Sequence, residues 1–98
     1  MVVIVLENVP NRLRGILSRW CLEVRAGLFV GRLDARMREK LWEKIDDLME
    51  GEGSGVMCWS QNGAQGYAFR SLGANPRRAI ERDGLWLVAH ERKKRVKA

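Results

Sequence analysis

Short apolar runs along the chain predict its β-strands. Residues 1–6 are continuously apolar and mostly β-branched, which is typical of a strand covered on both faces or lying in the centre of a sheet. Shorter apolar runs lie at residues 28–31, 56–59 and 85–89. Residues 67–72 also predict a strand, in which successive side chains would point to opposite faces of the sheet. The pattern therefore predicts five strands.

A first helix is predicted directly after the first strand. Asn8 is expected to be its N-cap, and Pro10 suits the first turn, where its missing N–H would have had no partner. Apolar side chains then recur at helical spacing from Leu13 to Val24, so the helix should be about four turns long and end at Ala26-Gly27. Trp20 lies on this apolar stripe and is expected to be in the core.

A second helix is predicted between Asp34, its expected N-cap, and Glu50. Trp42 widens its apolar stripe and should also be a core residue, while Arg38 and Glu39 belong to its solvated face. Residues 61–66 have the composition of a hairpin loop. Residues 73–78 are expected to form a second loop, since Pro76 disfavours helical backbone at the residue before it.

These elements predict an α+β fold of one domain over residues 1–89, with a basic tail over residues 90–98. The predicted order, β-α-β-α-β-β-β, differs from the ferredoxin-like order βαββαβ unless one short strand is miscalled. The expected fold class is ferredoxin-like βαββαβ with an extra C-terminal strand. Trp59 and Trp86 lie on predicted strands and belong either to the core or to an interface.

The positive net charge of the chain favours a polyanionic partner. The 98-residue chain has a formal net charge of +6, of which residues 91–98 contribute five basic minus one acidic side chain, or +4. The remaining +2 makes the globular part only mildly basic. No stretch approaches a membrane span, Cys21 and Cys58 lack metal or disulfide spacing, and His90 is the only histidine. A cytoplasmic protein with no membrane partner is expected.

Several motifs together resemble one family. They are Glu7-Asn8-Val9-Pro10-x-Arg12-Leu13-Arg14-Gly15, Trp20-x-Leu22-Glu23-Val24-Arg25-Ala26-Gly27-x-x-Val30-Gly31, Arg38-Glu39-x-x-Trp42-Glu43, Val56-Met57-x-Trp59 and Asp83-Gly84-Leu85-x-Leu87-Val88. Over residues 1–89 the chain resembles the CRISPR-associated protein two (Cas-two) family in its type I-E form.

The resemblance implies a fold, an assembly and a function. Members of the family are ferredoxin-like homodimers whose last strand crosses to the sheet of the partner protomer. In type I-E systems the dimer bridges two dimers of the CRISPR-associated protein one (Cas-one) integrase. The complex captures short double-stranded DNA and inserts it into the CRISPR array, a process called spacer acquisition.

The resemblance also assigns roles to particular residues. Arg12 and Arg14 match arginines that contact the backbone of the captured DNA, and Arg77 and Arg78 match a second pair. Glu7 matches an acidic residue proposed to act in metal-dependent phosphodiester cleavage. Magnesium would be the expected metal, because it binds one or two carboxylates and keeps several waters, so a two-fold axis could bring two copies of Glu7 to one ion.

Alternative readings remain open at these positions. Glu7 could instead pair with Arg12 or complete the helix start, and the four arginines could simply be solvated surface charges. The scaffold function therefore has a rival, a magnesium-dependent endonuclease that cuts RNA or DNA with paired Glu7 residues. A third reading is a protein–protein module whose charge is incidental. The sequence contains no helix rich in base-reading side chains, so DNA binding should not depend on base sequence.

Overall fold

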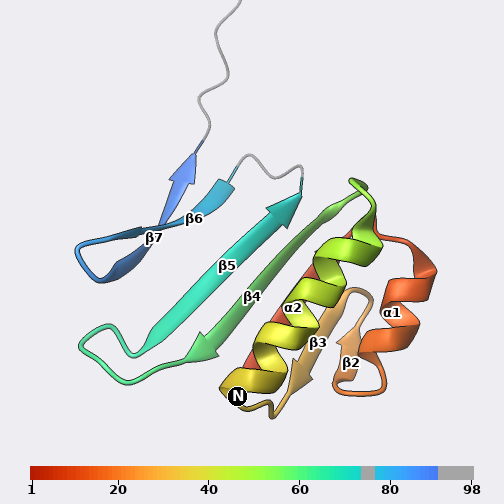
Figure 1. The fold of residues 1–98 in the computed structure, drawn as a ribbon, viewed down its shortest axis with the longest axis horizontal. Helices are drawn as coiled ribbons and strands as arrows, with labels where there is room; N and C mark the ends of the chain where they lie inside the picture. The colour runs from red at the N-terminus through yellow and green to blue at the C-terminus, as the bar shows by residue number, and fades with distance from the viewer. Residues whose placement is uncertain (74–76, 91–98) are drawn as a thin grey trace, which may run out of the picture.

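The computed structural model describes residues 1–73 and 77–90 (Figure 1). Its elements are, in order, β1 (Val2–Glu7), α1 (Asn11–Leu17), β2 (Leu22–Arg25), β3 (Leu28–Gly31), α2 (Ala35–Met49), β4 (Ser54–Ser60), β5 (Tyr67–Gly73), β6 (Arg77–Arg82) and β7 (Leu85–His90). The predicted tail begins at residue 90, but His90 is the last residue of β7. The rest of the tail, residues 91–98, lies outside the described residues, and so does Pro76. Neither of the two helices described has the length and apolar composition that crossing a membrane requires.

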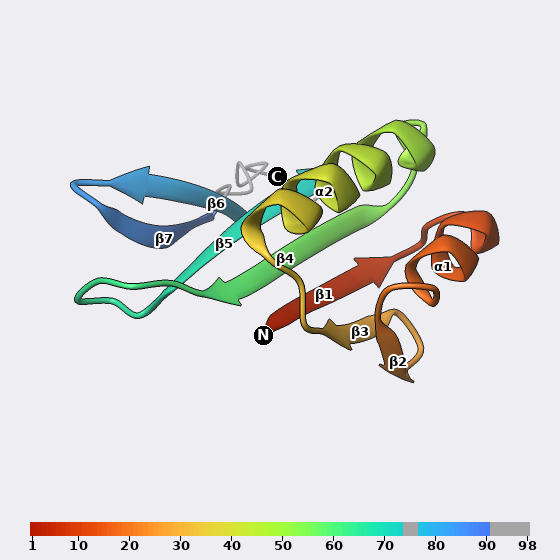
Figure 2. The ribbon, with the colours of Figure 1, turned by 60° about the horizontal axis from the view of Figure 1, so that its bottom comes forward.

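Five of the strands form one antiparallel sheet, in the order β2-β3-β1-β4-β5. Strands β1 and β2 run parallel on either side of β3, and β3 and β4 run parallel on either side of β1. This arrangement of two interleaved βαβ units with two helices is compatible with the predicted ferredoxin-like fold. Both helices lie on the same face of the sheet (Figure 2).

The core lies between the helices and this face of the sheet. In β1, Val2, Ile4 and Leu6 are buried, and Ile4 is opposite Phe29, which is fully buried. The other face of the same strands carries no helix in the described structure. It is also apolar, since the register places on it Val3, Val5, Leu28, Val30, Val56 and Cys58. The prediction that β1 is central is therefore confirmed, although the protomer covers it on one face only.

The first helix is shorter than predicted, because α1 ends at Leu17. The prediction that it continues to Val24 is wrong: Leu22–Arg25 form the edge strand β2, joined to β3 by the turn at Ala26 and Gly27. Gly27 has a φ of +79°, and a Cβ atom there would clash with the carbonyl oxygen of Leu6. The backbone of this segment finds its hydrogen-bond partners in β3, an element that helical spacing along the chain does not reveal.

Trp20 is not in the core, contrary to the prediction. Its side chain is 51% exposed, whereas that of the next residue, Cys21, is buried. The backbone N–H groups of both residues donate to the carbonyl oxygen of Leu17 and close a turn after the helix. This turn breaks the helical spacing, so Cys21 takes the buried position and Trp20 points outward. Trp42 and Trp59 are buried, as predicted for Trp42.

The two predicted N-caps have different outcomes. Asp34 caps α2, since its Oδ1 accepts a hydrogen bond from the backbone N–H of Met37 at 2.8 Å. Asn8 does not cap α1. It has a left-handed backbone with a φ of +56°, which asparagine tolerates better than most residues, and Pro10 occupies the N-cap position.

The final part of the described chain is a hairpin, β6–β7, separate from the main sheet (Figure 1). Residues 77 and 78 were predicted to lie in a loop, but they begin β6, opposite His90 and Ala89 of β7. The pattern of apolar positions predicted no strand over residues 77–82, because this segment is mostly charged. It forms a strand through its pairing with the apolar β7, which was predicted.

Candidate nucleic-acid interface

The segment that follows β1 is positioned by two close backbone approaches. Leu6 pairs with the β2–β3 turn, since its N–H donates to the carbonyl oxygen of Gly27 at 2.7 Å. On the other side, a Cβ atom at Gly53 would clash with the carbonyl oxygens of Glu7 and Asn8. The carboxyl end of β1 is therefore held between two turns, and the start of α1 is fixed with it.

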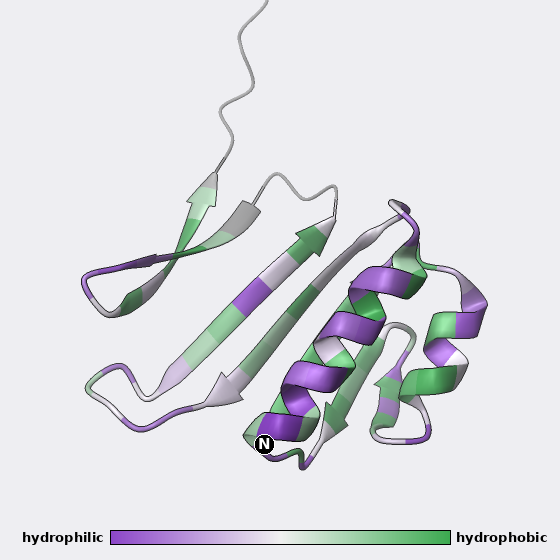
Figure 3. Ribbon diagram, viewed as in Figure 1, coloured by the Kyte–Doolittle hydropathy of each residue, from purple (hydrophilic) through white to green (hydrophobic). Residues whose placement is uncertain are grey.

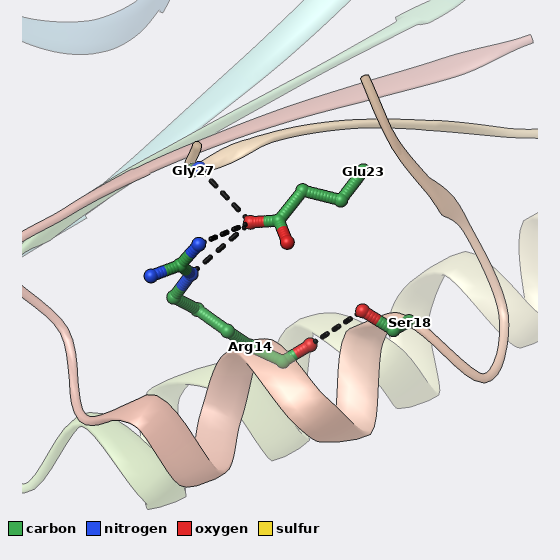
Figure 4. Close-up of polar contacts among 4 residues, drawn as sticks. All are labelled: Arg14, Ser18, Glu23 and Gly27. Atoms are coloured by element: carbon green, nitrogen blue, oxygen red, sulfur yellow. Dashed lines mark hydrogen bonds and ion pairs between the residues drawn. The ribbon is translucent and has the colours of Figure 1, made fainter. Parts of the chain in front are cut away.

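Arg14 is fixed by an ion pair with Glu23 of β2 (Figure 4). Its Nε and Nη2 atoms donate to Glu23 Oε2 at 3.0 and 2.9 Å. The same oxygen accepts the backbone N–H of Gly27 at 3.1 Å. The hydrogen bond from Gly27 and the Arg14 guanidinium both lower the pKa of Glu23. This network ties α1 to the β2–β3 hairpin and sets the direction of the guanidinium.

Arg12, by contrast, is exposed, and within the described residues it forms no ion pair. The alternative in which it pairs with Glu7 is therefore not observed in this protomer. Arg12 and Arg14 lie within one turn of α1, so one free and one oriented guanidinium stand at the start of the same helix. Since its charge is not compensated by any of the described residues, the Arg12 guanidinium is free to form charge-assisted hydrogen bonds with a phosphate.

A hollow of about 280 Å³ lies beside Arg14 at this end of the sheet. It is lined by Leu6, Asn8, Val9, Arg14, Ala26 and Gly27. The hollow is wide open to solvent and brings the end of β1 together with the β2–β3 turn. Arg14 is the charged residue of its lining, and Glu23 partly neutralises that charge.

Glu7 ends β1 and its side chain is exposed. Across residues 1–73 and 77–90, no three histidine, cysteine, aspartate or glutamate side chains are grouped as metal ligands. One exposed carboxylate does not make a magnesium site, because a bound ion needs further fixed ligands. The residues of a single protomer thus do not fit the metal, and the predicted site would require Glu7 of a second copy.

The second predicted arginine pair lies at the start of the C-terminal hairpin. The backbone of Arg77 and Arg78 belongs to β6, while their side chains lie outside the described part of the structure. The structure does not bring this strand into the hollow beside Arg14, because β6 lies beyond β5, at the opposite side of the sheet from β2 (Figure 1). The two pairs are therefore separate positions along one protomer.

Arg38 and Glu39 have a structural role that the sequence pattern did not indicate. They were predicted to be solvated, yet the side chain of Arg38 is only 17% exposed. Its guanidinium carbon lies 4.2 Å from the ring centre of Trp59, and Glu39 Oε1 pairs with Arg70 Nη2 at 2.7 Å. This cluster attaches α2 to β4 and β5. In the sequence, only the alternation of side chains along β5, which places Arg70 on the same side as the helices, pointed to this cluster.

Sequence comparison identifies the group to which the chain belongs. The family model of the CRISPR-associated protein (Cas_Cas2CT1978) matches residues 1–87. The chain belongs to this CRISPR-associated protein family. The match covers every described strand and helix except the end of β7, and it supports a Cas-two-type protein with a role in CRISPR adaptation. A CRISPR-associated protein of this kind works with other CRISPR-associated proteins.

Proposed function

We propose that this protein is a dimeric scaffold of CRISPR adaptation of the type I-E form. In this proposal it acts in the cytoplasm, holds double-stranded DNA without reading its sequence and bridges dimers of the Cas-one integrase. The family match over residues 1–87 carries the proposal. The open face of the sheet and the start of α1 support its two physical requirements, which are self-association and phosphate binding.

The uncovered face of the sheet supports the homodimer. Val5 is 38% exposed at the centre of an apolar surface that also includes Val3, Leu28, Val30 and Val56. A contiguous apolar surface of this kind is typical of an interaction site, since burying it stabilises the assembly by about 25 cal/mol per Å². A second copy of the same face is complementary in hydrophobicity and would cover it symmetrically.

The start of α1 supports phosphate binding. Arg12 is exposed and, among the described residues, has no acidic partner, whereas Arg14 uses Nε and Nη2 on Glu23 and keeps Nη1 outside these hydrogen bonds. Arg12 therefore supplies charge, and Arg14 supplies a donor of fixed direction but partly neutralised charge. Contacts of this kind position the DNA backbone without selecting a sequence. Arg77 and Arg78 would add a second set of contacts on the hairpin.

This division of roles gives a test by salt dependence. The affinity of the protein for a short DNA duplex is measured over a series of salt concentrations, with and without Cas-one. Arg12→Ala should reduce the slope of log affinity against log salt by about 0.9 for each phosphate that the variant no longer neutralises. Arg14→Ala should reduce it less, because Glu23 already compensates that charge.

Arg25→Ala is the matched control, since Arg25 is exposed on β2 and is not one of the predicted DNA contacts. An unchanged slope for Arg12→Ala would show that the start of α1 does not hold the duplex. Equal reductions for Arg12→Ala and Arg25→Ala would mean that only net charge matters.

The dimer is tested separately with Val5→Lys. A charge in the centre of the open face should raise the dimer dissociation constant by at least about tenfold, measured by analytical ultracentrifugation. Asp47→Asn, at an exposed position of α2 on the covered side of the sheet, changes the charge by the same amount and is the control. If Val5→Lys stays dimeric, the two copies associate through another surface.

The rival function, metal-dependent cleavage of RNA or DNA, is favoured by one observation. Glu7 is exposed, and within the described residues it is engaged in no ion pair or side-chain hydrogen bond, so no structural role accounts for it. Under the scaffold proposal, Glu7→Ala leaves duplex binding and spacer acquisition intact. Loss of acquisition by a folded, dimeric Glu7→Ala variant, with duplex binding retained, would favour the enzyme.

A further inference from the structure

A second hollow lies between α2 and the turn that follows α1, away from the arginines described above. It has a volume of about 270 Å³ and is lined by Trp20, Leu33, Met37, Lys40, Leu41 and Lys44. We propose that this hollow beside Trp20 and α2 binds a peptide segment of a partner protein, with one large apolar side chain as an anchor and acidic residues beside it. The inference does not depend on DNA binding or on the dimer.

The apolar part of the hollow is preformed. Trp20 is 51% exposed, yet its backbone N–H is bonded to the carbonyl oxygen of Leu17 at 3.0 Å. The neighbouring Cys21 is buried beside Gly31, where a Cβ atom would meet its Sγ at 2.8 Å. The indole is therefore exposed on a fixed backbone. Met37 adds a flexible side chain that can adapt to the shape of an anchor.

The charges around the hollow complement an acidic segment. Lys40 and Lys44 are four residues apart on α2, and Arg36 precedes Lys40 by the same interval. Like charges at this spacing repel each other and destabilise a helix. Within the described residues none of the three forms an ion pair, not even Lys44 with Asp47 one turn later. Their charge is therefore available to a partner.

Most acidic side chains of α2 lie away from the hollow. Counting 100° per residue from Arg36, Lys40 and Lys44 fall at about 40° and 80°, beside the apolar stripe on the α1 side. Glu39, Glu43 and Asp46 fall at about 300°, 340° and 280°, whereas Asp47 falls at about 20°, between Arg36 and Lys40. Figure 3 shows this outward surface of α2 as mainly hydrophilic. Asp47 forms no ion pair within the described residues and does not line the hollow, whose charged lining residues are Lys40 and Lys44. An acidic ligand in the hollow therefore meets these two lysines.

The lining favours a peptide over a nucleic acid. A base could stack on Trp20, but its polar edge would then lie against Leu33, Met37 and Leu41, none of which offers a side-chain hydrogen bond. Burying that polar edge without hydrogen-bond partners is unfavourable. An aliphatic or aromatic side chain has no such cost, and hot-spot anchors in protein interfaces fill pockets of this kind.

The test uses NMR on the full chain and a defined probe. The probe is a capped hexapeptide with leucine and phenylalanine at its centre and two acidic residues on each side. It should shift the Trp20 indole N–H signal, assigned with Trp20→Phe, and the amide signals from Met37 to Lys44. The shifts should saturate with a dissociation constant below about 1 mM. Absence of saturable shifts at these residues would overturn the proposal.

Matched probes and variants test the contribution of charge to peptide binding. The same peptide with lysine in place of each acidic residue should bind at least about tenfold more weakly, and so should the original peptide on Lys40→Glu/Lys44→Glu. Lys40→Gln/Lys44→Gln is the fallback if the charge reversal unfolds the protein, as judged by its amide spectrum. Arg82→Glu, at an exposed position of β6, is the control and should change the affinity less than about twofold.

Two further results would contradict the proposal. Equal binding of the acidic and basic peptides would remove the charge complementarity on which it rests. A thymidine hexanucleotide that shifts the Trp20 signal and the Lys40 and Lys44 amides at concentrations where the acidic peptide does not would identify the hollow as a nucleic-acid site instead.

Discussion

The sheet with its two helices and the C-terminal hairpin are held in place in different ways. The sheet body, residues 2–73, is stabilised by a continuous core in which Ile4, Phe29 and Met57 are fully buried. The hairpin, residues 77–90, has Leu85, Leu87 and Val88 exposed and forms a separate two-stranded sheet. An isolated two-stranded hairpin is marginally stable in water, so contacts with the body must hold it.

Those contacts are few and specific. The side-chain amide of Gln65 donates to the carbonyl oxygen of Trp86 and accepts its backbone N–H, both at 2.8 Å. The Ser71 hydroxyl accepts the N–H of Ala79 at 2.9 Å, and the Trp86 ring packs edge-on against Trp59. Arg12 and Arg14 are thus attached to the cooperative core of the sheet body. The strand that carries Arg77 and Arg78 is held by local contacts. Three substitutions measure this difference.

The largest effect is expected in the sheet body. Ile4→Ala removes a fully buried side chain opposite Phe29 and should lower the free energy of unfolding by about 2–5 kcal/mol, because it leaves a cavity in the core. Urea denaturation at fixed protein concentration measures the change. Val88→Ala, at a 49% exposed position of the hairpin, should cost less than about 1 kcal/mol. Similar decreases at both positions would mean that hairpin and body share one core.

A smaller and local effect is expected for Gln65→Ala. The variant lacks both hydrogen bonds to the Trp86 backbone, which are worth about 1 kcal/mol each, so the hairpin should open more often while the body stays folded. Hydrogen exchange at the Trp86 amide should become about tenfold faster or more, whereas exchange at Ile4 should not change. Asn62→Ala, in the same loop, is the control. Faster exchange throughout the sheet would contradict the separation of the two regions.

The smallest effect is expected for Glu23→Gln, and it should depend on pH. Because the folded state lowers the pKa of Glu23, the ionised carboxylate stabilises the fold above the ordinary glutamate pKa of about 4.3 and loses this contribution as the pH falls below it. At pH 7 the variant should have a lower Tm than the wild type. At pH 3 the difference should shrink. If the difference in Tm were the same at pH 3 and pH 7, the decrease would come from the changed packing of the side chain rather than from the loss of the ion pair with Arg14.

Much of the sheet body could be predicted because its signals are local. The apolar run of β1, the Asp34 cap of α2 and the loop between β4 and β5 each lie within a few residues. The hairpin was only half predicted, since β7 is apolar and β6 is charged. The arginines of the candidate interface were identified by the family resemblance, and their binding roles stay predictions.

The sequence by itself determined the strands and helices with clear periodicity, the basic character of the chain and its CRISPR-associated family. Tertiary structure alone decided that residues 22–25 leave the first helix to pair with β3, since that pairing depends on backbone groups outside the segment. From that pairing follow the exposure of Trp20 and the contact of Glu23 with Arg14. Helical spacing describes only neighbours along the chain, and these contacts join separate elements.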